Sequence, residues 1–121
     1  MVKLTPELIY FLDDLTNKYC KQMSIDIKPL IITSTENLPN KGMKISVSLS
    51  MRNDKECLAL HYPSTEEFKP DLIFLDVGRH KNKKQLEKTL VHELCHTKFG
   101  AGHWKEFYDN IELILKGKRF K

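Results

Sequence analysis

Residues 82–99 read NKKQLEKTLVHELCHTKF, and this stretch decides the fold because it predicts a long helix with two different faces. An apolar stripe recurs every four residues and consists of Leu86, Leu90 and Leu94. Such a stripe indicates a face that packs against a core. His92 and His96 are also four residues apart, and they project from another face of the same helix. We therefore expect one side of this helix to pack and another side to carry chemistry.

Five residues of this helix, His92-Glu93-Leu94-Cys95-His96, form an HExxH motif. Imidazoles four residues apart are separated by only about 40° around a helix axis, a spacing that suits one tetrahedral zinc ion. Glu93 lies beside them, and a carboxylate there can take a proton from zinc-bound water, whose pKa the metal lowers to about 7. The motif predicts peptide hydrolysis with Zn²⁺ as cofactor and Glu93 as general base. We expect Cys95 to pack in the core rather than to bind metal.

A third protein ligand has to come from the chain downstream of the motif. His103 is the first choice, because Gly100 and Gly102 can end the helix and return the chain to the metal. Glu106 and Glu112 compete for this position, since a carboxylate from a following helix is the third ligand in thermolysin-like sites. Two other interpretations stay open: an HExxH run that arose by chance, and a structural zinc site without turnover.

Length and composition predict a single domain, residues 1–121, that is large enough to bury a core without disulfides. Cys20, Cys57 and Cys95 include no CxxC pair, so neither a disulfide framework nor a thiolate zinc site is predicted. No apolar run approaches the roughly 18 residues of a membrane span, and the N-terminus lacks a signal-peptide core. We expect a cytoplasmic monomer without membrane contact, with a nuclear location open if the source is eukaryotic.

The net charge is +4, and basic residues concentrate from Arg79 to Lys84 and in the tail from Lys116 to Lys121. Such clusters can neutralise the phosphates of DNA or RNA, although a solvated surface is the commoner role. We expect a protein or peptide substrate, and nucleic-acid association through these two clusters stays an alternative.

The elements around the motif helix predict an α+β domain. Thr5 and Pro6 open a helix that extends to about residue 22. A short buried strand is expected at 30–33. Residues 43–51 alternate between apolar and polar side chains, which predicts a strand that forms a hairpin with 56–62 across a turn at 52–55. A further strand is expected at 71–77, and a last helix from about His103 to Lys116. The sheet should be small, with three or four mostly antiparallel strands.

Several single residues carry weaker expectations. Tyr108 belongs to the apolar stripe of the last helix, which predicts a core residue, with hydrogen-bond donation to an oxyanion as the less favoured role. His61 and His80 are expected on the surface. We expect the side chains of Ser46, Ser48 and Ser50 to face solvent.

The run from Asp71 to Phe107 resembles the catalytic half of SprT-like and WLM-type zinc metallopeptidases. In those families an apolar strand leads to an HExxH helix, and a third histidine opens an H-x-x-x-F element, here His103-Trp104-Lys105-Glu106-Phe107. The resemblance covers about the last third of the chain. It implies that His92, His96 and His103 are metal ligands and that Glu93 is the base.

The spacing after the motif separates this chain from neighbouring families. Six residues lie between His96 and His103, whereas WLM-type and YgjP-like proteins usually have five and SprT-like proteins tolerate longer inserts. The metzincin pattern HExxHxxGxxH is absent, because Phe99 and Gly102 occupy its glycine and histidine positions. A minigluzincin type would use a glutamate in place of His103. A YbeY-type zinc ribonuclease and a non-catalytic zinc-containing binding module are the alternatives from other classes; the ribonuclease motif lacks the adjacent glutamate.

Overall fold

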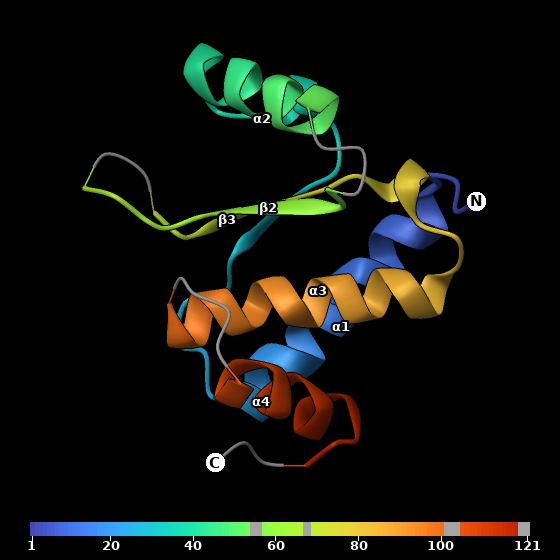
Figure 1. Ribbon diagram of the computed structural model, residues 1–121, viewed down its shortest axis with the longest axis vertical. Helices are drawn as coiled ribbons and strands as arrows, with labels where there is room; N and C mark the ends of the chain where they lie inside the picture. Colours follow the sequence, from blue (N-terminus) through green and yellow to red (C-terminus); the bar gives the residue numbers. More distant parts are fainter. Residues whose placement is uncertain (54–56, 67–68, 101–104, 119–121) are drawn as a thin grey trace.

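The computed structural model describes residues 1–53, 57–66, 69–100 and 105–118. Within these residues the fold is α+β, as predicted. It has four α-helices, where three were expected, and a sheet of three strands. The elements in chain order are α1 (Pro6–Met23), β1 (Leu30–Ile32), η1 (Thr35–Asn37), α2 (Lys41–Asn53), β2 (Ala59–Tyr62), β3 (Leu72–Leu75), η2 (Val77–Arg79), α3 (Lys83–Phe99) and α4 (Lys105–Leu115). In Figure 1, α2 lies on one side of the sheet, α1 and α3 lie on the other, and α4 packs beyond α3.

Helix α1 forms for the reasons that the sequence indicates. The Thr5 hydroxyl accepts a hydrogen bond from the Leu8 N–H at 3.1 Å, and Pro6 occupies the first helical turn. Ser24 ends the helix in a left-handed conformation. The buried face of α1 belongs to the main core and includes Leu8, Leu12, Leu15, Tyr19 and Met23.

The sheet has the strand order β1-β3-β2 and is mixed. β3 pairs parallel with β1 and antiparallel with β2, and all four of its residues are buried. Successive side chains of β3 point to opposite faces: Ile73 and Leu75 join the main core, whereas Leu72 and Phe74 join a second, smaller cluster under α2. The strand predicted at 30–33 is confirmed, but it is not fully buried, since Leu30 is exposed at the edge of the sheet.

The strand predicted at 43–51 is wrong, because these residues lie inside α2. Alternating apolar positions include every fourth residue, so Met43, Val47 and Met51 also form one face of a helix, and this face packs on the sheet. Ile45 and Leu49 are left exposed. The predicted hairpin is therefore wrong as well, since β2 pairs with β3 in the register Leu60↔Phe74. Arg52 and Asn53 belong to the helix, and the rest of the predicted turn, 54–55, lies outside the described residues.

Helices α3 and α4 follow the prediction closely. The Asn82 side chain caps α3 by accepting a hydrogen bond from the Gln85 N–H at 2.9 Å. The predicted stripe of Leu86, Leu90 and Leu94 is completely buried. Helix α4 contributes Phe107, Ile111 and Ile114 to the same core. Its predicted start at His103 lies outside the described residues. In the described part of the chain, no helix is both long enough and apolar enough for a bilayer crossing.

Candidate metal centre

The two histidines of the motif lie together on the C-terminal half of α3. Their Nε2 atoms are 3.2 Å apart, and their ring centroids are 4.9 Å apart at an interplanar angle of 73°. Two nitrogen ligands of a tetrahedral zinc ion, each at 2.0–2.1 Å, would be about 3.3 Å from each other. In the metal-free protein the same distance fits an N–H···N hydrogen bond. His92 and His96 are therefore already spaced as two ligands of one ion.

The other ring nitrogen of His96 is held by the residue that ends α3. His96 Nδ1 lies 3.1 Å from the carbonyl oxygen of Gly100, which can only accept, so Nδ1 carries the hydrogen. In the neutral ring the lone pair is then on Nε2, the atom that faces His92. Gly100 also donates its N–H to the His96 carbonyl at 2.8 Å. Its φ of 90° and ψ of −173° belong to a region that is nearly exclusive to glycine.

Replacing Gly100 by alanine should therefore change the orientation of His96 through the backbone and, if His96 is a zinc ligand, weaken zinc binding. The added Cβ would meet no atom within 4 Å, but the strained φ would move the carbonyl that orients His96. We expect the zinc dissociation constant to rise at least about tenfold, as for other groups that orient a ligand. Competition with a chromophoric chelator measures this constant. Gly117→Ala is the matched control, since Gly117 has a φ of 75° and lies after α4. Equal zinc affinities of the two variants would contradict the assigned role.

Glu93 follows His92 in the motif and is almost completely removed from solvent. Its residue is only 7% exposed. Burial raises the pKa of Glu93 from 4.5 to about 7. A carboxyl group with a pKa near neutrality can both take up and release a proton at physiological pH.

Two aromatic residues of α4 contact the histidines. The Phe107 ring is buried, and its centroid lies 4.6 Å from that of His96 and 5.2 Å from that of His92. Tyr108 is 48% exposed, with its ring centroid 6.3 Å from that of His92. The prediction that Tyr108 is a core residue is wrong, because position 108 lies at the edge of the buried face of α4. Its phenol ring lies beside the motif instead.

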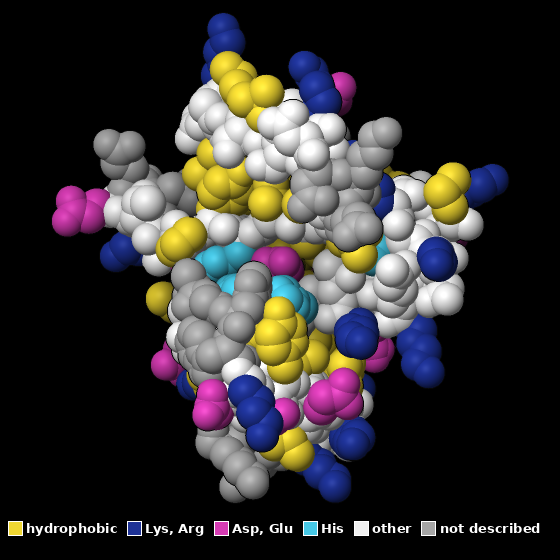
Figure 2. Space-filling view, viewed as in Figure 1, with side chains coloured by type: hydrophobic (Ala, Val, Ile, Leu, Met, Phe, Trp, Pro, Cys, Tyr) yellow, Lys and Arg dark blue, Asp and Glu magenta, His cyan; other side chains and the backbone are white. Residues whose placement is uncertain are grey.

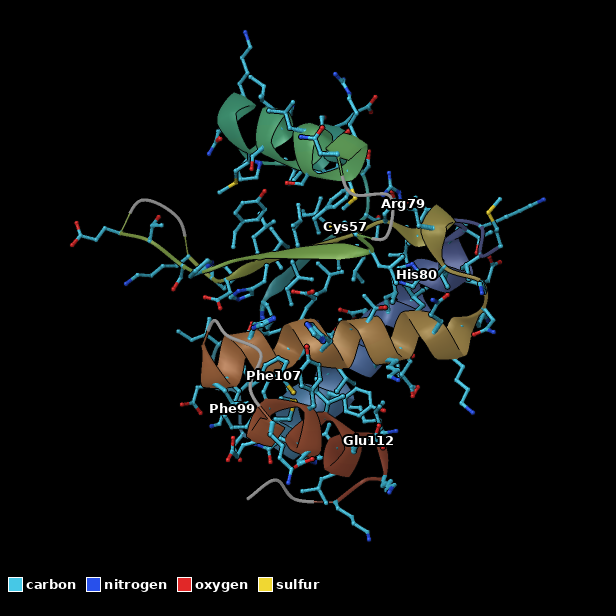
Figure 3. The ribbon with its side chains drawn as sticks, in the orientation of Figure 1. Cys57, Arg79, His80, Phe99, Phe107 and Glu112 are labelled. Carbon is cyan, nitrogen blue, oxygen red and sulfur yellow. The ribbon has the colours of Figure 1, made fainter. Side chains whose placement is uncertain are left out.

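The predicted third ligand, His103, lies outside the described residues and stays a prediction. Among the residues that are described, no three His, Cys, Asp or Glu side chains form a group that could hold a metal ion. Glu106 and Glu112 are exposed on α4, and neither forms such a group with the two histidines. Figure 3 shows Glu112 farther along α4 than Phe107, the residue that contacts the histidines. Cys95 packs in the core, as predicted, and burial raises the pKa of its thiol to about 12.

The predictions that His61 and His80 lie on the surface are both wrong. His80 is fully buried: Nδ1 donates to the Asp76 carbonyl at 2.7 Å, and Nε2 lies 3.0 Å from the Thr89 hydroxyl oxygen. His61 lies on β2, 5.9 Å from the His96 ring. The alternation along β2, with Leu60 and Tyr62 on the other face, was the only sequence signal for this orientation of His61. The serine prediction is confirmed for Ser46 and Ser48, whereas Ser50 is half-buried.

The first basic cluster is only partly available to a partner. The Arg79 guanidinium donates to the carbonyls of Met51 at 2.6 Å and Cys57 at 3.2 Å, and Nε lies 3.2 Å from an Asp76 carboxylate oxygen (Figure 3). Arg79 therefore caps the C-terminal end of α2. Exposed lysines remain at Lys81, Lys83 and Lys84. In the second cluster, residues 116–118 are exposed and 119–121 lie outside the described part.

Figure 2 shows histidine and acidic side chains together in the middle of one face, with apolar side chains above and below them. The candidate site combines two closely spaced imidazoles, a mostly buried carboxyl group and a half-exposed phenol ring. Comparison of the chain with protein-family models, curated proteins and solved structures finds no match.

Proposed function

We propose that this protein is a zinc-dependent metallopeptidase of the SprT-like type, which cleaves peptide bonds within a chain. The observation that carries the proposal is the 3.2 Å separation of the Nε2 atoms of His92 and His96, which matches two ligands of one tetrahedral ion. The buried carboxyl group of Glu93 beside this pair supports catalysis over a purely structural site, which would need no base.

Each role in the proposed reaction belongs to a named residue. His92, His96 and His103 would hold the ion. When bound there, zinc supplies Lewis acidity and lowers the pKa of a water molecule to about 7. Glu93 accepts the proton of the attacking water and passes it to the nitrogen of the leaving amine. Tyr108, with its half-exposed ring near His92, donates a hydrogen bond to the oxyanion.

The edge of the sheet next to α3 offers a place for the substrate backbone. β2 is an edge strand among the described strands, and its residue His61 points toward α3 and contacts His96. A peptide that adds to β2 as a further strand would pair through its main chain, so binding would tolerate many sequences. The same peptide would run past the two motif histidines.

The proposal is tested by zinc content and cleavage in the same preparations. The wild-type protein should bind one zinc per chain and cleave casein, whereas His92→Ala and His96→Ala should lose both properties. Lys84→Ala is the control, since Lys84 is an exposed residue of the same helix, and it should keep both. A wild-type protein that binds no zinc would overturn the proposal.

Two further outcomes separate the proposal from the other classes. Cleavage of structured RNA with no cleavage of casein would identify a YbeY-type ribonuclease. Stoichiometric zinc with cleavage of neither polymer would identify a binding module with an inert metal.

A further inference from the structure

The sheet brings His61, a residue outside the motif helix, against the proposed ligand His96. On β2, Leu60 and Tyr62 pack with the cluster under α2, whereas Ala59 packs against the main core on the other face. Alternation along the strand places His61 on the same face as Ala59, toward α3. The ring of His61 stacks with that of His96, with centroids 5.9 Å apart and planes inclined by 27°.

The ring of His61 is held in place by Asp71, the residue before β3. His61 Nε2 lies 2.8 Å from Asp71 Oδ2, and the side chains of the pair are only 11% and 17% exposed. The other carboxylate oxygen of Asp71 accepts the Ser64 N–H at 2.8 Å. Burial alone would raise the pKa of Asp71, but the hydrogen bonds from His61 and Ser64 outweigh burial and lower it. The carboxylate is therefore ionised, and His61 Nε2–H is the donor.

His96 is thus restrained from three directions. Gly100 accepts the hydrogen bond from its Nδ1, and Phe107 of α4 stacks on the ring with centroids 4.6 Å apart and planes inclined by 30°. His61 stacks from β2, and Figure 1 shows β2 and α4 on opposite sides of α3. A phenylalanine at position 61 could also stack, but it could not be fixed by a hydrogen bond to Asp71.

We propose that His61 and Asp71 form a positioning pair for the metal ligand His96: Asp71 fixes the His61 ring, and the ring fixes the orientation of the His96 imidazole. This inference rests on the proposed function, since it gives His96 the role of a ligand. In this proposal neither His61 nor Asp71 binds the metal or contacts the substrate. The pair acts before any substrate binds, so its effect appears in the affinity for the ion.

The test measures zinc affinity by chelator competition and the visible spectrum of the cobalt(II)-substituted protein. His61→Phe keeps a ring and loses the bond to Asp71, whereas His61→Gln keeps a hydrogen-bond donor and loses the ring. We expect each variant, and Asp71→Asn, to raise the zinc dissociation constant by about 10- to 100-fold and to alter the cobalt spectrum. Asp13→Asn is the matched control, because it removes the same charge from the exposed Lys28 pair, and it should change neither measurement.

The double variant shows whether Asp71 acts through His61. If it does, His61→Phe combined with Asp71→Asn should bind zinc no more weakly than His61→Phe alone. If Asp71 acted on the ion directly through its charge, the second substitution would weaken binding further, and the proposed pair would be overturned. Unchanged zinc affinity in the soluble, folded variants among His61→Phe, His61→Gln and Asp71→Asn would also overturn it. A wild-type protein that binds zinc without cleaving peptides contradicts only the peptidase proposal, whereas one that binds no zinc contradicts both.

Discussion

Replacing Glu93 by glutamine is expected to lower the rate of peptide cleavage by about 100- to 10,000-fold while one zinc per chain is retained. Glutamine has nearly the same shape as glutamate, but its amide cannot take a proton from water. The proposed ligands are His92, His96 and His103, so the substitution leaves all of them in place. Cleavage of a labelled casein and metal analysis of the same sample measure the two effects.

The same substitution should stabilise the metal-free protein in a way that depends on pH. Burial raises the pKa of Glu93 from 4.5 to about 7 in the folded protein, so folding favours the protonated form. The free energy of unfolding of the wild-type protein should therefore fall as the pH rises from 4.5 through 7. The amide introduced by Glu93→Gln does not titrate. The free energy of unfolding of this variant should therefore exceed that of the wild type by an amount that grows with pH and reaches about 3 kcal/mol at pH 8.

Urea unfolding after removal of metal by a chelator measures this difference at pH 4.5 and pH 8. Loss of activity together with a gain in stability would exclude misfolding as the reason for the inactive variant. Full peptidase activity of Glu93→Gln would remove Glu93 as the base. A stability difference that does not change with pH would contradict the assigned effect of burial.

Replacing Phe107 by alanine is expected to lower the free energy of unfolding by about 3 to 5 kcal/mol. The Phe107 ring is completely buried where α4 packs on α3, and its removal leaves a cavity beside both motif histidines. Zinc affinity should fall as well, because one of the contacts that restrain His96 is lost. Urea unfolding of the metal-free protein and chelator competition measure the two effects.

The neighbouring residue provides the control for this substitution. Tyr108→Ala removes a ring of similar size from the same turn of α4, but Tyr108 is 48% exposed. Its loss should cost about 1 kcal/mol or less. If both variants lost the same stability, the packing of α4 on α3 would differ from the arrangement described above.

Much of the helical part of this fold could be predicted, because its signals are local. A hydroxyl cap with proline begins α1, an asparagine cap begins α3, and stripes spaced by three and four residues mark the buried faces. The sequence does not predict α2, because the alternating pattern of residues 43–51 fits both a strand and one face of a helix. Only the packing of Met43, Val47 and Met51 against the sheet decides between them, and that depends on distant residues.

The candidate site also has a part that local sequence predicts and a part that depends on tertiary packing. The spacing of His92, Glu93 and His96 is local, so the sequence predicts that they lie together on one helix. The contact of His61 with His96 depends on the strand order β1-β3-β2, which places β2 beside α3. The Gly100 carbonyl and the stacking of Phe107 depend on how α3 ends and how α4 packs. None of these arrangements follows from the spacing of residues along the chain.

The sheet separates two buried clusters that share no residue. In the described part of the chain, the main core joins α1, α3 and α4, whereas α2 is held by a much smaller group with Val47 and Met51 at its centre. Detaching α2 therefore requires less free energy than opening the main core. We therefore expect the amides of α2 to exchange with solvent before those of α3, while the layer that carries the motif histidines stays folded.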